Sequence, residues 1–103
     1  MKLKFDIKAC LAPLAEITDI PFRSLVREFS SCLMFTEMIS AAGVYQNNQK
    51  TVGMMKLAAS EHPIGVQLFG HNPEQLATAA KMAEDVGADI IDINMGCPVK
   101  KIV

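Results

Sequence analysis

The chain has 103 residues, and its 10 Lys and Arg against 11 Asp and Glu give a formal net charge of -1. Half of the residues are hydrophobic and 20% are charged, which excludes an intrinsically disordered chain because such chains are poorer in apolar side chains. A membrane-spanning helix is also excluded, since it needs about 20 consecutive apolar residues and the apolar runs here are short and interrupted.

The first part of the chain predicts a strand followed by a helix. Residues 9–15 form a short apolar run broken by Pro13, as expected of a strand that ends in a turn. Thr18 or Asp19 is suited to cap a helix that begins near Pro21, because proline is favoured in the first helical turn. Apolar residues then recur at helical spacing.

The middle of the chain predicts two further strands with a helix between them. Residues 32–39 are rich in strand-forming side chains, and residues 64–69 form another compact apolar run. Residues 41–59 suggest a helix of weak periodicity that contains two glycines.

The last part of the chain carries the clearest helical signals. Asn72 is a plausible N-cap, Pro73 stands at the first helical position, and Gly87 stands where a left-handed C-cap belongs. Residues 88–94 then predict a fourth strand.

The alternation of strands and helices predicts an α/β fold with a parallel sheet. Flavodoxin-like sheets, Rossmann sheets and (β/α) barrels all begin in this way, but no GxGxxG or GxxxxGK motif follows any strand. We therefore expect the N-terminal part of a (β/α)8 TIM-type barrel, with about four parallel strands and three helices. In such a barrel the carboxyl ends of the strands carry the chemistry.

Strand parity indicates which polar side chains would point into the barrel. Side chains alternate between faces, so Asp92 and Asn94 share one face of their strand, and Gly65 and Gln67 share one face of theirs. If the branched aliphatic residues between them face the helices, Gln67 and Asn94 point inward. Gly65 would leave room there for a planar group.

The cysteines and the charge balance limit the function further. The chain has three cysteines, Cys10, Cys32 and Cys97, which is an odd number and includes no CxxC pair. Neither a disulfide framework nor a zinc site is therefore expected. Reduced thiols and an N-terminus without an apolar signal segment favour a cytoplasmic location. The even charge means that any affinity for nucleic acid must come from a local patch or from sequence outside this chain.

Four motifs occur in an order that is specific to one family. They are LAPLAEITDIPFR (11–23), TEMIS (36–40), VQLFG (66–70) and NMGCP (94–98). Together they resemble the tRNA-dihydrouridine synthases, most closely the bacterial branch. These are flavin mononucleotide (FMN) enzymes built on a (β/α) barrel with a helical C-terminal domain.

The resemblance implies FMN-dependent reduction of uridine to 5,6-dihydrouridine in tRNA, with NADPH or NADH as the reductant of the flavin. It implies that Cys97 is the general acid that protonates C5 of the uracil ring, and that Asn94 contacts the uracil. From the residues alone, Cys97 is either a small buried hydrophobe or a functional thiol, and Asn94 either caps the end of its strand or contacts a ligand. Because the target base must leave its stack, base flipping is implied as well.

The same resemblance implies which residues bind the cofactor. The backbone of Pro13, Leu14 and Ala15 would lie against the isoalloxazine, and Gln67 would hydrogen-bond the flavin ring. From the residues alone, an alternative stays open for each: the first three residues could simply end a strand, and Gln67 could be a buried amide satisfied by backbone. No metal site is implied.

Some positions depart from the family pattern or remain open. The family usually has Met where this chain has Leu14, and Gly where it has Glu16. Lys100 and Lys101 are either a solvated pair or contacts to tRNA phosphates, and Glu37 is not assigned. Cys10 and Cys32 match no functional position, and we expect them in the core.

The length predicts a partial barrel, since a complete one has roughly 250 residues. We expect residues 1–103 to be part of a flavin-binding barrel domain, with the remaining barrel and a helical tRNA-binding domain absent. Such a fragment would be inactive alone and would self-associate or need the missing half-barrel. Two alternatives stay open: another FMN barrel oxidoreductase of the dihydroorotate or enoate type, and a non-catalytic truncated remnant.

Overall fold

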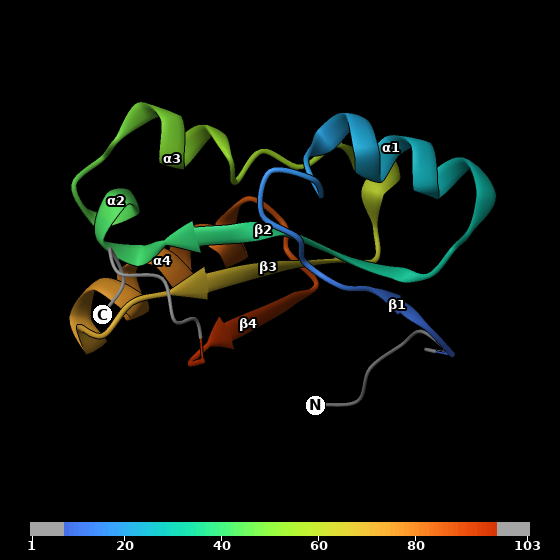
Figure 1. Ribbon diagram of the computed structural model, residues 1–103. Coiled ribbons are helices and arrows are strands. Elements are labelled where there is room, and N and C mark those ends of the chain that lie inside the picture. Colours follow the sequence, from blue (N-terminus) through green and yellow to red (C-terminus); the bar gives the residue numbers. More distant parts are fainter. Residues whose placement is uncertain (1–7, 97–103) are drawn as a thin grey trace.

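The computed structural model describes residues 8–96 and has one parallel sheet among them. Its strands lie in sequence order, β1 (Cys10–Leu11), β2 (Leu33–Ser40), β3 (Ile64–Phe69) and β4 (Ile90–Asn94). All three strand pairs are parallel, and the arrowheads of β2, β3 and β4 lie at the same end of the sheet (Figure 1). Four parallel strands joined by helices confirm the expected α/β fold, which is consistent with the first part of a TIM barrel.

Helical segments connect the strands. In the described part of the chain they are α1 (Ile20–Phe29), α2 (Ala41–Tyr45), α3 (Gln49–Gly53), a 3₁₀ helix (Ala59–Glu61) and α4 (Pro73–Asp85). Asp19, and not Thr18, caps α1, because its Oδ1 accepts a hydrogen bond from the N–H of Phe22 at 3.0 Å.

The single helix predicted over residues 41–59 is wrong. Asn47 adopts a left-handed conformation with φ of 57°, which ends the first short helix. The side chain of Asn48 then accepts a hydrogen bond from the N–H of Thr51 and caps the second. Local amide chemistry therefore breaks this connection into α2 and α3.

Helix α4 begins and ends at the predicted residues. The side chain of Asn72 accepts a hydrogen bond from the N–H of Gln75 at 3.1 Å, and Pro73 opens the helix. Gly87 has a φ of 99° and follows the C-cap. The N–H of Ala88 bonds the carbonyl of Ala83 at 3.1 Å, which completes a Schellman motif.

The core lies between one face of the sheet and the helices. Ile39, Val66 and Leu68 are fully buried there, and Ala79 and Ala83 of α4 pack against them. The small alanines let α4 approach the sheet closely. The polar side chains described below lie on the opposite face of β3 and β4, called here the open face because α4 packs on the other side of the sheet.

The open face does not leave room beside Gly65. Phe35 stands opposite Gly65 in the ladder between β2 and β3, just before a β-bulge that shifts the register between Phe35 and Met38. A Cβ atom at Gly65 would lie 2.5 Å from Cε1 of the Phe35 ring. The prediction that this glycine makes space for a planar ligand is therefore wrong, because a ring of the same chain fills the space.

Candidate active site at the carboxyl ends of the strands

Three polar side chains from two neighbouring strands meet on the open face. The Nε2 of Gln67 donates to the Oδ2 of Asp92 at 2.7 Å, and the Nδ2 of Asn94 donates to the Oε1 of Gln67 at 3.4 Å. The same Nδ2 lies 3.9 Å from the sulfur of Met38 on β2. The expectation that Gln67 and Asn94 share a face is confirmed.

The neighbours of Gln67 determine the orientation of its amide. A carboxylate oxygen can only accept while Asp92 is ionised, so the group that faces Asp92 is the amide nitrogen. Gln67 is only 8% exposed, which makes an unpaired amide costly and keeps this arrangement in place. Sequence analysis did not assign Asp92 a role, although its shared parity with Asn94 was the available signal.

The loop after β1 is closed by a threonine. The N–H of Leu14 donates to the Oγ1 of Thr18 at 3.0 Å, and the carbonyl of Leu14 accepts from the N–H of Thr18 at 2.9 Å. Thr18 is fully buried, whereas the side chain of Leu14 is 46% exposed. Among the three predicted loop contacts, Pro13 is half-buried and Ala15 is exposed. The loop therefore exposes the side chains of Leu14 and Ala15, while the buried Thr18 holds its backbone in place.

A carboxylate on β2 supports the next residue of this loop. Glu16 has a φ of 65°, a conformation that glycine adopts more readily than other residues. Its N–H donates to the Oε1 of Glu37 at 2.5 Å. Glu37 therefore hydrogen-bonds the backbone of this loop. The backbone is left-handed at Glu16, the position where the family that the sequence resembles usually has glycine.

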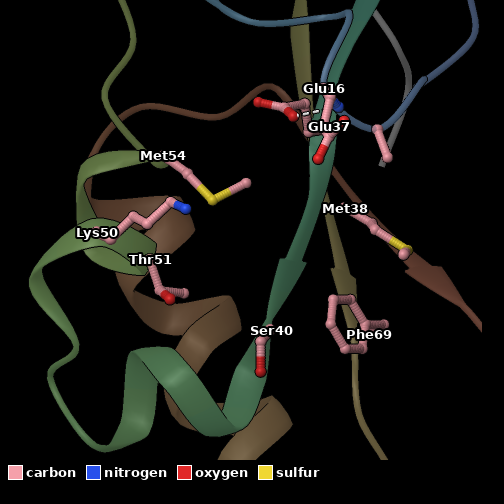
Figure 2. Close-up of a pocket in the computed structure, with 9 residues that line it drawn as sticks. Glu16, Glu37, Met38, Ser40, Lys50, Thr51, Met54 and Phe69 are labelled. Atoms are coloured by element: carbon pink, nitrogen blue, oxygen red, sulfur yellow. Dashed lines mark hydrogen bonds between the residues drawn. The ribbon is translucent and has the colours of Figure 1, made fainter. Parts of the chain in front are cut away.

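A cavity of about 350 Å³ lies between this loop, the end of β2 and α3. Figure 2 shows Lys50 and Met54 extending across it toward β2, with Glu37 and Glu16 at its upper end and Phe69 on the opposite wall. It thus holds one ammonium and two carboxylates from elements far apart in sequence. Sequence analysis missed Lys50, since a lone lysine on a short helix gives no signal.

The two structurally described cysteines are free thiols. Cys10 is exposed because it lies on a two-residue edge strand, so its expected place in the core is wrong; Cys32 is half-buried. Cys97, Lys100 and Lys101 lie outside the described residues. Over residues 8–96, no group of three or more His, Cys, Asp or Glu is placed to hold a metal ion.

None of the helices within residues 8–96 has the length and apolar character needed to cross a membrane. On the exposed side of α4, the pKa of Lys81 is raised, first by its hydrogen bond and charge interaction with Asp85 and then by Glu84.

Comparison with known proteins gives a consistent result. A family model described as dihydrouridine synthase (Dus) matches residues 10–103. The chain is 44% identical over 96 residues to a probable tRNA-dihydrouridine synthase of Rhizobium leguminosarum, and 43% identical over 95 residues to tRNA-dihydrouridine synthase B of Xanthomonas campestris. These alignments cover 93% and 92% of this chain.

A probable tRNA-dihydrouridine synthase of Rickettsia prowazekii is 40% identical over 102 residues, which cover 98% of this chain. The aligned part is 30%, 29% and 31% of the three relatives in turn. The chain therefore spans about 30% of the length of the curated relatives that it matches.

Proposed function

The chain belongs to the dihydrouridine synthase family, and from this premise we propose that the whole protein reduces uridine in tRNA to 5,6-dihydrouridine. The family match over residues 10–103 is the observation that carries the proposal. The hydrogen-bonded side chains of Gln67, Asp92 and Asn94 support it, because they lie where a barrel enzyme binds its reactants. Residues 1–103 would supply the first part of the barrel, and tRNA-binding surface would lie in other parts of the protein.

The residues at this end of the sheet fit a flavin. The amide nitrogen of Gln67 has two hydrogens and uses one toward Asp92, so the other is free to donate to a ring heteroatom. In the loop of Pro13, Leu14 and Ala15, the exposed side chains of Leu14 and Ala15 offer an apolar surface for a planar ring. We therefore propose FMN as cofactor, with NADPH or NADH as the reductant. Bound FMN supplies the hydride for C6 of the uracil.

Asn94 and Cys97 would act on the uracil itself. An asparagine amide offers both a donor and an acceptor, as the uracil edge does, so Asn94 would orient the flipped base. Cys97, three residues farther along the NMGCP motif, would donate its thiol proton to C5. The double bond between C5 and C6 becomes single, the ring gains one hydride and one proton, and solvent returns a proton to the thiolate.

The test uses the whole protein, NADPH and an unmodified tRNA transcript. We expect dihydrouridine in the digested tRNA, detected by mass spectrometry as a gain of two hydrogens, and no reduction of free uridine. Reduction of a free small molecule such as an enoate, with tRNA left unchanged, would instead favour the other class of flavin barrel. A protein that binds FMN but reduces neither substrate would be a non-catalytic remnant.

A further inference from the structure

A buried ion pair lies beside the proposed cofactor loop. The Nε of Arg23 on α1 is 2.5 Å from the Oε1 of Glu61, and the two side chains are 2% and 1% exposed. Burying two charges is expensive, and such a pair is often no more stabilising than a well-packed apolar pair. A role in stability alone therefore explains this pair poorly.

Arg23 also reaches the loop. Its Nη1 donates to the backbone carbonyl of Thr18 at 2.6 Å. The hydroxyl of Thr18 in turn accepts a hydrogen bond from the N–H of Leu14 at 3.0 Å and donates one to the carbonyl of Leu14 at 3.2 Å. The guanidinium is thus linked to the loop through one residue, since Thr18 bonds Arg23 with its backbone carbonyl and Leu14 with its side chain.

On the other side, Arg23 reaches the segment before β3. The Oε2 of Glu61 accepts from the N–H of Ala58 at 2.6 Å, so the carboxylate is tied to the 3₁₀ segment. That segment leads into β3, which carries Gln67. Arg23 is therefore linked to the two elements that we propose to touch the flavin, to the loop through Thr18 and to β3 through Glu61 of the preceding 3₁₀ helix.

One atom of the guanidinium, the buried Nη2 of Arg23, makes no hydrogen bond within the described residues. An unsatisfied buried nitrogen costs free energy of folding. What only the forked guanidinium provides is a fixed distance between Thr18 and Glu61.

We propose that Arg23 is a positioning residue that holds the loop of Pro13–Ala15 at the correct distance from β3 for flavin binding. It acts through Thr18 on one side and Glu61 on the other, and touches neither the cofactor nor the uracil. This inference rests on the proposed function, because it requires a flavin against that loop.

The same helix supplies a matched control. Arg27 lies one turn after Arg23 and also bonds the segment before β3, since its Nη2 donates to the carbonyls of Glu61 and Pro63 at 2.7 and 3.1 Å. Its Nη1 donates to the carbonyl of Cys32 at 2.7 Å. It too has a buried nitrogen without a partner among the described residues. Its bonds go to carbonyls away from the loop.

The experiment compares Arg23→Lys, Thr18→Val, Thr18→Ser and Arg27→Lys in the whole protein. FMN affinity is measured by quenching of FMN fluorescence, the ring environment by the visible spectrum of bound FMN, and stability by thermal unfolding of the protein without FMN. We expect Arg23→Lys and Thr18→Val to weaken FMN binding about tenfold and to shift the flavin spectrum. Thr18→Ser should restore both readouts, and Arg27→Lys should lower only the Tm.

Two results would overturn the inference while the proposed function stands. One is wild-type FMN affinity and spectrum in both Arg23→Lys and Thr18→Val. The other is an equal loss of affinity in Arg23→Lys and Arg27→Lys, which would show a merely structural role. If the wild-type protein itself binds no FMN, the proposed cofactor is wrong, and the inference falls with it.

Discussion

At the scale of single residues, hydrogen bonds between side chains organise the polar face of β3 and β4. Gln67 is held from two sides by Asp92 and Asn94, so its amide is already oriented before a ligand arrives. Preorganised groups of this kind bind more tightly because little ordering remains to be done on binding. Substitutions on this face therefore test function directly.

Gln67→Leu in the whole protein should weaken FMN binding by about 1–3 kcal/mol, since a hydrogen-bond partner in a buried site is lost. The affinity is measured by fluorescence titration, with Asp92→Asn as the comparison because an asparagine can still accept from Gln67. Unchanged FMN content in Gln67→Leu would show that this residue is only a packed amide.

Cys97→Ala should leave reduction of the flavin by NADPH intact and lower dihydrouridine formation roughly 10²–10⁴-fold, which is the usual contribution of a positioned acid. Flavin reduction is followed by loss of visible absorbance, and the tRNA product by mass spectrometry. Near-normal turnover of tRNA by this variant would refute the assignment of Cys97.

Glu16→Gly should leave the free energy of unfolding within about 0.5 kcal/mol of wild type. The left-handed φ of 65° favours glycine, while the greater freedom of glycine in the unfolded chain offsets the gain. Glu16→Val should destabilise by about 1–2 kcal/mol, because a β-branched side chain resists this conformation. Denaturant unfolding measures both, and equal stability of the two variants would contradict the account.

At the scale of elements, the pairing of β2 with β3 shapes the open face. The ring of Phe35 lies over Gly65, and the β-bulge that follows lies between Phe35 and Met38. Within the bulge, the hydroxyl of Thr36 accepts a hydrogen bond from the N–H of Gln67 at 3.2 Å, so β2 also supports the backbone of the central residue of the site.

Gly65→Ala should destabilise the protein by about 1–3 kcal/mol, because the new methyl group would lie 2.5 Å from the Phe35 ring. Adding Phe35→Leu should recover part of the loss, since the two residues are in contact and their effects are coupled. Gly53→Ala is the matched control, with no atom within 4 Å of the added carbon. Equal unfolding free energies for the two glycine variants would refute the packing argument.

At the scale of the whole molecule, the described sheet has two unpaired sides. Each of the edge strands β1 and β4 pairs with one neighbour among residues 8–96. Large apolar side chains are also uncovered, with Phe29 at the end of α1 82% exposed and Met95 after β4 92% exposed. Open strand edges and exposed apolar side chains promote association with further chain.

The isolated polypeptide of residues 1–103 should therefore self-associate, bind FMN weakly or not at all, and reduce no tRNA. Size-exclusion chromatography with light scattering gives the mass, and an absorbance titration gives the FMN stoichiometry. The whole protein serves as the positive control. A stable monomer that binds one FMN would show that these residues contain more of the site than we propose.

Much of the fold was predictable from sequence because its signals are local. The caps of α4 at Asn72 and Gly87 depend on residues within one helical turn, and the shared face of Gln67 and Asn94 follows from the period of a strand. The break between α2 and α3 was missed although Asn48 carried the capping signal.

The sequence by itself thus determined the order of the strands, the polar face of β3 and β4, and the family. The tertiary structure alone decided that Phe35 fills the space at Gly65 and that Arg23 pairs with Glu61, 38 residues away. The reason is physical. Periodicity and capping depend on neighbours along the chain, whereas these contacts depend on the register and packing of elements that meet only after folding.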